Sequence, residues 1–112
     1  MVDLGEVWWA DFPYEDISGS KVRPVVIVGA NHDTYHCVTL MVTSQNPSDD
    51  KIYEIEHWNQ AGLKKPSYIR LMNKHTFHFS ELINRIGCLH NNDQINLWLR
   101  IDEVYDHKID LF

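Results

Sequence analysis

Short apolar and β-branched runs dominate the first two-thirds of the chain and predict β-strands. The expected strands are residues 6–12, 24–28, 38–44, 52–58 and 66–71. The run at 24–28 (PVVIV) is apolar throughout, which is typical of a strand covered on both faces. In 38–44 (VTLMVTS) the residues at 38, 40 and 42 share one face, so Thr43 is expected to point away from the core if that face is buried.

The hydrophobic period changes near the C-terminus and predicts two helices. Ser80 is expected to cap a short helix that reaches Arg85 and stops at Gly87. A longer helix is expected to start after Asn91 or Asn92 and to pack across the sheet through an apolar stripe. The stripe consists of Ile95, Leu97, Trp98, Leu99, Ile101, Val104 and Tyr105. The whole pattern predicts a mainly β fold with a C-terminal helix, built as a small barrel or a strongly curled sheet.

The composition is that of one ordinary globular domain spanning residues 1–112, with 44% hydrophobic and 23% charged residues. Cys37 and Cys88 are too few for a disulfide framework, and we expect both to be reduced and buried. No apolar run approaches the roughly 18 residues of a membrane helix, and the N-terminus lacks a signal-peptide pattern. We therefore expect a cytoplasmic protein without a membrane segment.

The formal charge of -6 has the wrong sign for holding nucleic acid by bulk electrostatics. The charge is unevenly distributed, however, because residues 51–90 carry six basic side chains against three acids. The basic residues are Lys51, Lys64, Lys65, Arg70, Lys74 and Arg85. They form a locally positive face only if they cluster in space.

Residues 5–12 (GEVWWADF) fit the pattern G-[DE]-[IV]-x-x-x-x-[FL], and after a polar loop residues 22–28 (VRPVVIV) contain R-P-x-x-[VI]. At this spacing the two segments resemble the PemK/MazF family of toxins from type II toxin–antitoxin modules. Later pieces follow in the family's order. They are residues 42–44 (VTS), 68–71 (YIRL) with Thr76, and 85–89 (RIGCL).

This resemblance implies an SH3-like barrel of the PemK/MazF/CcdB type, usually a homodimer, that cleaves single-stranded RNA at short sequences. The family needs no metal or other cofactor, and a labile antitoxin protein holds it inactive. Arg23 matches the family's catalytic arginine and Thr43 its catalytic threonine, with Ser44 as the alternative if the register is displaced by one. Met72 stands where some branches carry an acidic residue.

These residue types suit RNA cleavage by the 2′-hydroxyl of the RNA itself. Arg23 would offer a fork of donors to the charged phosphorane oxygens, and Thr43 would donate or relay a hydrogen bond there. Neither side chain is an obvious general base. Further RNA contacts are expected from Tyr14, Lys21, Arg70 and Lys74.

Each of these residues also has a purely structural interpretation. Arg23 can form a salt bridge with Glu15 or Asp16 of the loop, and Thr43 suits any strand end. The spacings His32-x-x-x-His36 and His75-x-x-His78 would tolerate a metal, but no HExxH motif is present, the cysteines are isolated and both pairs lie in or beside strand and loop segments, so we expect no metal site. His75 and His78 could instead assist proton transfer.

The alternative function is a non-catalytic SH3-like binding module. It includes a toxin relative that inhibits a protein target such as a topoisomerase. Such a module would depend on exposed aromatic side chains rather than on Arg23 and Thr43.

Overall fold

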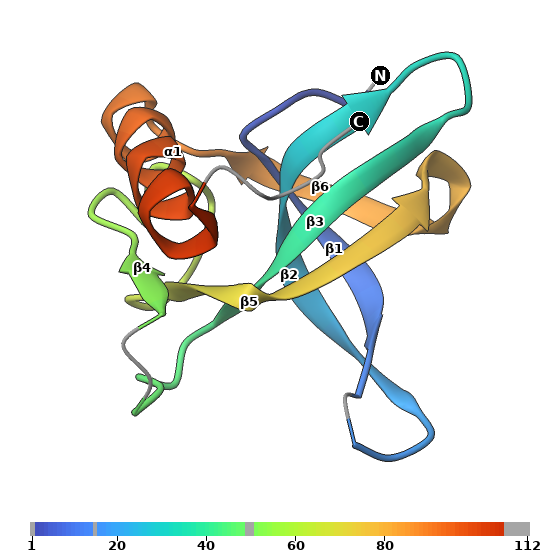
Figure 1. Ribbon diagram of the computed structural model, residues 1–112, viewed down its shortest axis with the longest axis horizontal. Coiled ribbons are helices and arrows are strands. Elements are labelled where there is room, and N and C mark those ends of the chain that lie inside the picture. Colours follow the sequence, from blue (N-terminus) through green and yellow to red (C-terminus); the bar gives the residue numbers. More distant parts are fainter. Residues whose placement is uncertain (1, 15, 49–50, 107–112) are drawn as a thin grey trace.

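The computed structural model describes residues 2–14, 16–48 and 51–106, which are built around one antiparallel sheet packed against a C-terminal helix (Figure 1). The strands run in the order β4-β5-β3-β2-β1-β6. In chain order the elements are β1 (Glu6–Pro13), β2 (Ser20–Asn31), β3 (His36–Thr43), β4 (Ile52–Glu54), β5 (Tyr68–His78), the 3-10 turn η1 (Phe79–Glu81), β6 (Leu82–Cys88) and α1 (Asn91–Tyr105). The predicted β-rich fold with a C-terminal helix is confirmed. The sheet is curled but not closed, and β4 and β6 form its edges.

Two hydrophobic clusters cover the two faces of the sheet. The helix-side cluster includes Leu40 and Val42 of β3, packed with Leu97 and Ile101 of α1. The opposite cluster comprises Val2, Ala10, Phe12, Val25, Ile27, Cys37, Met41, Phe77 and Leu82. Burying one aliphatic side chain stabilises a fold by about 1.5–3 kcal/mol. β3 is therefore buried on both faces between its two end residues, His36 and Thr43, which are half-exposed.

The helix predicted between Ser80 and Arg85 is wrong. Ser80 is not a cap but lies inside the short turn η1, whose N-cap is His78. The amide of Ser80 donates to Nδ1 of His78, and the carboxylate of Glu81 accepts from the amide of His78. From Leu82 onward the chain forms β6, because pairing with β1 provides backbone partners that a six-residue helix would lack. The described residues therefore form six strands where five were expected.

Gly87 lies inside β6 and does not stop a helix. A Cβ at this position would lie 2.2 Å from the carbonyl oxygen of Ala61, so only glycine allows the turn before Leu63 to approach β6 this closely. Ala61 itself is fully buried. The contact holds the segment that follows β4 against the sheet edge.

β5 is longer than the sequence indicated and contains a wide irregularity. Met41 of β3 pairs with Arg70, but the preceding Leu40 pairs with Lys74, so the intervening residues of β5 have no partner on β3. The predicted alternation before this point is confirmed, since Ile69 is buried in the helix-side cluster and Arg70 lies on the other face. The bulge changes the direction of the strand and re-aims the residues within it.

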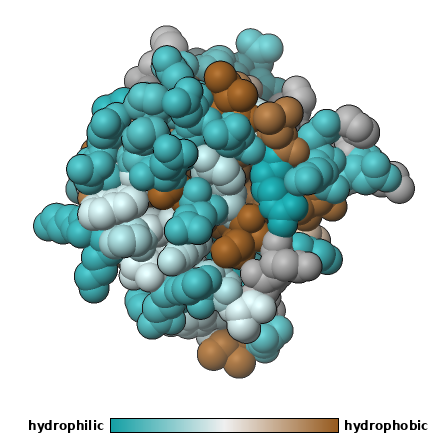
Figure 2. Space-filling view, turned by 90° about the vertical axis from the view of Figure 1, so that its left-hand side faces the viewer, coloured by the Kyte–Doolittle hydropathy of each residue, from teal (hydrophilic) through white to brown (hydrophobic). Residues whose placement is uncertain are grey.

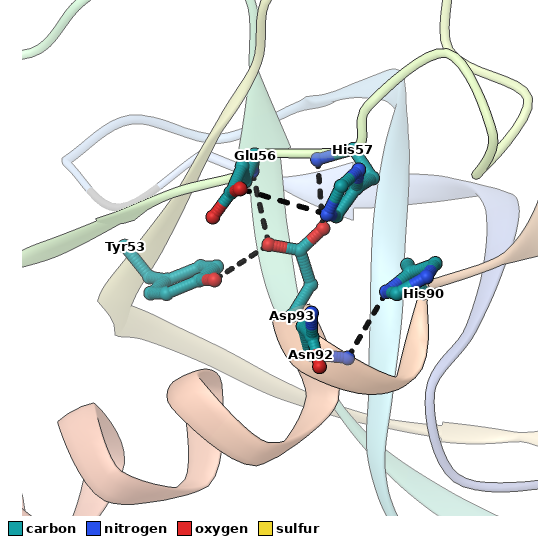
Figure 3. Close-up of polar contacts among 6 residues, drawn as sticks. All are labelled: Tyr53, Glu56, His57, His90, Asn92 and Asp93. Atoms are coloured by element: carbon teal, nitrogen blue, oxygen red, sulfur yellow. Dashed lines mark hydrogen bonds and ion pairs between the residues drawn. The ribbon is translucent and has the colours of Figure 1, made fainter.

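The first turn of α1 is tied to the end of β4 by a buried carboxylate (Figure 3). Asp93 is fully buried and accepts hydrogen bonds from the hydroxyl of Tyr53 at 2.5 Å and from the amides of Glu56 and His57, each at 2.9 Å. Burial and the Asp93 carboxylate raise the pKa of Tyr53, so the phenol stays a donor. These bonds end the strand at Glu54, which corrects the longer strand predicted for 52–58.

The N-cap of α1 is His90, and the sequence had indicated Asn91 or Asn92. Nδ1 of His90 accepts a hydrogen bond from the amide of Asn92 at 3.1 Å. The predicted stripe is only partly buried, because Ile95 and Leu99 remain 60% and 63% exposed. Figure 2 shows the face that carries α1 and β4 as mainly hydrophilic, with small separate apolar areas.

The two cysteines are free and differ in environment. Cys37 is buried, as predicted, and burial raises the pKa of its thiol to about 11. Cys88 is only half-buried, which corrects the expectation for that residue. No helix in the described ranges is long and apolar enough to cross a membrane.

Candidate functional site

Arg23 and Thr43 lie on the same face of two neighbouring strands. Val25 of β2 pairs with Met41 of β3, and residues two apart in a strand share a face. Arg23 comes two residues before Val25, and Thr43 comes two residues after Met41. Both therefore lie on the face of the sheet that the opposite cluster covers. Both are half-buried, so the strands fix their stems while their polar ends remain accessible.

The side chains of Arg23 and Thr43 border a pocket of about 230 Å³, here called the threonine pocket. Lys21 and Ser44 also line it. The hydroxyl of Thr43 accepts a hydrogen bond from the amide of Gln45 at 3.2 Å. Since a hydroxyl has one proton and two lone pairs, this bond orients the oxygen and leaves its proton available for a ligand.

Arg23 also borders a second pocket, of about 370 Å³, on its other side. This hairpin pocket lies under the loop between β1 and β2, which projects from the sheet in Figure 1. Its lining includes Pro13, Tyr14, Asp16, Ile17, Arg23, Met41, Arg70 and Asn73. Two guanidinium groups from different strands therefore border one cavity.

A third pocket, of about 490 Å³, adjoins the threonine pocket on the helix side of the sheet end. Both pockets are bordered by Pro24, Val42, Thr43 and Ser44. In this tryptophan pocket the side chain of Trp9 is 40% exposed, and Lys64 and Lys65 stand on the far wall. An exposed indole beside lysines is a surface on which a base can stack while its phosphate is neutralised.

The three pockets share lining residues and are together called the groove. Its basic members are Lys21, Arg23, Lys64, Lys65 and Arg70, and the acid among its described lining is Asp16. The groove is thus locally positive on a chain of formal charge -6. Of the six basic residues in 51–90 that were expected to cluster, three line the groove, namely Lys64, Lys65 and Arg70, and Arg70 shares a pocket with Arg23.

Arg23 and Arg70 make no ion pair in the described part of the chain, although Asp16 borders their pocket. Glu15, the other partner considered for Arg23, lies outside the described residues. The Nε atom of Arg70 is buried and has no hydrogen-bond acceptor among the residues described. Buried guanidinium donors are normally satisfied, so this unpaired Nε is an exception within the described residues.

The structure brings together six of the seven predicted site residues. Arg23, Thr43, Ser44, Lys21, Tyr14 and Arg70 all line the groove. Lys74 is exposed beyond the β5 bulge, opposite Leu40, and lines none of the three pockets. Arg85 is also elsewhere, on β6, where its Nε donates to Glu6 at 3.1 Å.

The histidines considered for proton transfer do not line the groove. The His75 ring packs edge-on against the Phe77 ring, with 4.5 Å between the ring centroids, and His78 is the N-cap of η1. Within residues 2–14, 16–48 and 51–106 no group of three or more His, Cys, Asp or Glu side chains is placed to hold a metal ion.

Sequence reasoning missed Asn73 and undervalued Trp9. Asn73 reaches the hairpin pocket because of the β5 bulge, and a bulge leaves no mark in the sequence pattern. Trp9 lies within β1, opposite Pro24 of β2 and Asn84 of β6, and its side chain is 40% exposed at the tryptophan pocket. The adjacent Trp8 points to the other face and donates to Glu6.

Comparison with known proteins decides the family. The sequence matches PemK-like, MazF-like toxins of type II toxin–antitoxin systems over residues 3–105. The chain belongs to this family. A search of curated protein sequences gave no match.

Solved structures similar to this PemK/MazF-family chain share its fold at low sequence identity. An endoribonuclease in complex with its cognate antitoxin from a mycobacterial species is 15% identical, with a TM-score of 0.74 and coverage of 98% of this chain and 100% of that chain. MazF from Deinococcus radiodurans is 13% identical, with a TM-score of 0.73 and coverage of 94% and 96%. The Mycobacterium tuberculosis toxin MazF-mt6 is 19% identical, with a TM-score of 0.65 and coverage of 88% and 96%.

Proposed function

We propose that this PemK/MazF-family chain is a toxin that acts as a metal-independent, sequence-selective endoribonuclease on single-stranded RNA in the cytoplasm. The chain would act as one domain spanning residues 1–112. The observation that carries the proposal is the placement of Arg23 and Thr43 on one face, at the centre of a basic groove.

The reaction uses the 2′-hydroxyl oxygen of the RNA as the nucleophile. This oxygen attacks the adjacent phosphorus and loses its proton, the P–O5′ bond breaks, and the departing O5′ takes up a proton. The products are a 2′,3′-cyclic phosphate and a 5′-hydroxyl. No metal is needed, because the enzyme has only to orient the nucleotide and stabilise the charge that grows on the phosphorane.

Arg23 and Thr43 divide that work at the scissile phosphate. The Arg23 guanidinium has no ion-pair partner in the described part of the chain, so its fork of donors is available to the non-bridging oxygens. The Thr43 hydroxyl, oriented by the Gln45 amide, donates its proton to the same phosphate. Ser44, next in the chain and exposed, is the alternative donor.

Selectivity for a short sequence comes from the pockets on either side. Trp9 in the tryptophan pocket and Tyr14 in the hairpin pocket offer aromatic rings to bases unstacked from a single strand. Both rings are 40% exposed. A duplex would keep its bases stacked and out of reach, which favours single-stranded RNA as the substrate.

The groove also suits an inhibitory partner. An acidic or apolar segment of a cognate antitoxin would neutralise Arg23 and fill the tryptophan pocket, which excludes RNA by occupying the same surface. We further propose that the chain works as a homodimer, as the family resemblance implies.

The experiment is to incubate the purified protein in EDTA with a long single-stranded RNA and to map the new ends by primer extension. Discrete cuts are expected with the wild type, and Arg23→Ala should reduce cleavage by on the order of 10²-fold or more. Arg85→Ala, which removes an arginine outside the groove, is the matched control and should cleave at the wild-type positions.

If Arg23→Ala cut the RNA as strongly as the wild type, the ribonuclease activity would stand, but its active site could not be assigned to Arg23 and the groove. Loss of cutting in EDTA that Mg²⁺ restores would contradict the metal-independent mechanism. Intact RNA with every protein, from a preparation shown to be free of antitoxin, would favour the non-catalytic binding module instead.

A further inference from the structure

The bulge in β5 turns Asn73 toward the hairpin pocket. In an unbroken strand Asn73 and Arg70 would lie on opposite faces, because they are three residues apart. Here Met41 pairs with Arg70 and Leu40 with Lys74, so one step along β3 corresponds to four steps along β5. The bulge reverses the alternation of the strand, and Asn73 therefore lines the same pocket as Arg70.

The side-chain amide of Asn73 is half-buried, and the fold makes no use of it. Within the described residues this amide forms no hydrogen bond. An amide has donor hydrogens on its nitrogen and an acceptor oxygen beside them. It can therefore make two parallel hydrogen bonds with the edge of a nucleobase, which also carries donors and acceptors side by side.

The hairpin pocket has the size and one wall of a site for a single base. Its volume of about 370 Å³ lies at the lower end of the range for ligand pockets, about 300–1,000 Å³. The amide of Tyr14 donates to the carbonyl of Gly19 at 3.1 Å, and a Cβ on Gly19 would lie 3.4 Å from two ring carbons of Tyr14. The neck of the hairpin thus fixes a ring that is 40% exposed and offers a stacking surface.

The polar groups of the pocket favour a base that carries an amino group. A carboxylate such as that of Asp16, which also lines the pocket, only accepts hydrogen bonds. The oxygens of Asn73 and Asp16 can therefore accept the two amino protons, while the nitrogen of Asn73 donates to the adjacent ring nitrogen. Adenine and cytosine present this pair of groups. Guanine and uracil present a carbonyl instead, which the Asp16 carboxylate repels.

We propose that Asn73 is a specificity-determining residue that reads one adenine or cytosine of the cleaved RNA in the hairpin pocket. This inference rests on the proposed ribonuclease function and names the class of base that the pocket takes. Arg23 lines both the hairpin pocket and the threonine pocket. The base that Asn73 reads therefore belongs to a nucleotide close to the scissile phosphate.

The test maps base preference at each position around the cut. A pool of single-stranded RNA with a randomised segment is digested in EDTA, and the new 5′-hydroxyl ends are sequenced. The wild type should prefer adenine or cytosine at one position that Asn73→Ala relaxes by on the order of tenfold, with the other positions unchanged. Asn73→Asp should prefer guanine at that position, because a carboxylate accepts from both N1–H and the amino group of guanine.

Two controls separate base reading from a change in charge or in rate. Asn91→Asp adds the same charge at an exposed position of α1 and should keep the wild-type preference at every position. A 2′-fluoro RNA lacks the attacking hydroxyl, so its dissociation constant can be measured without turnover. For two such RNAs that differ only at the base read by Asn73, the ratio of dissociation constants should fall to about one in Asn73→Ala.

Three results would overturn the inference and leave the ribonuclease proposal standing. They are a wild-type preference for guanine or uracil at the affected position, an unchanged preference in Asn73→Ala, and a loss in Asn73→Ala that is equal at all positions. The last of these would mean that Asn73 supports the groove without reading a base. If the wild type cut no RNA in the pool, both proposals would fail.

Discussion

At the scale of single residues, Thr43 shows how one hydroxyl can be both structural and chemical. Its oxygen accepts from the amide of Gln45 at the turn that leaves β3, which leaves its proton free to be donated to a ligand in the threonine pocket. The two interpretations of Thr43 that the sequence left open are therefore compatible, because they use different parts of the same group.

Thr43→Val separates these roles, since it keeps the branched shape and removes the hydroxyl. We expect kcat for RNA cleavage to fall by about 10²-fold, because one donor to the transition state is lost. Thr43→Ser, which restores the hydroxyl, should recover most of the rate. Single-turnover cleavage of one mapped site measures both variants, and equal rates for Val and Ser would move the role to Ser44.

At the scale of elements, the connection between β4 and β5 depends on the helix. Asp93 fixes the amides of Glu56 and His57, and the turn that follows is built on this segment, since the amide of Ala61 donates to the His57 carbonyl and that of Leu63 to the Trp58 carbonyl. The next residues, Lys64 and Lys65, form the wall of the tryptophan pocket. Asp93 of α1 therefore fixes the segment that carries Lys64 and Lys65, the wall of the tryptophan pocket.

Asp93→Ala should lower the free energy of unfolding by about 3 kcal/mol, because it leaves buried donors unpaired. Asn91→Ala, at an exposed position in the same helical turn, should change stability by no more than about 0.5 kcal/mol. Urea unfolding followed by tryptophan fluorescence checks both variants. A stability of Asp93→Ala within error of the control would show that water replaces the carboxylate at no cost.

The strands show where prediction from the sequence worked and where it did not. The runs around Val25 and Val42 are short, apolar and rich in β-branched residues, and both are strands as predicted. The family pattern then indicated Arg23 and Thr43 as site residues. β6 has no such signal, because Ser80 mimics a helix cap and pairing with β1 decides the outcome. Asn73 was missed because a bulge depends on tertiary pairing.

At the scale of the whole molecule, the net charge and the local field have opposite signs. The chain has a formal charge of -6, yet the described basic lining of the groove outnumbers its acidic lining. Net acidity limits non-specific attraction to nucleic acid, and the groove concentrates positive charge where bases can also stack. Binding is therefore expected to depend on the position of a charge more than on the total.

A pair of charge reversals with the same change in net charge tests this expectation. Lys64→Glu alters the groove and should weaken RNA binding by at least about tenfold. Lys74→Glu lies outside the groove and should change affinity less than about threefold. Titration of 2′-fluoro RNA at fixed ionic strength compares them directly. Equal losses would mean that bulk charge governs binding, or that Lys74 contacts RNA as the sequence suggested.

The link between Asp93 and the groove wall also orders events on the ribosome. The strands that carry Arg23 and Thr43 are synthesised early, but the bonds that hold the turn before Lys64 require a residue made some thirty positions later. A nascent chain therefore presents both proposed catalytic side chains before it has a finished wall to hold RNA against them. The groove wall is held in place only when α1 begins to form, so a nascent chain is expected to bind RNA in the proposed groove only after Asp93 has been added.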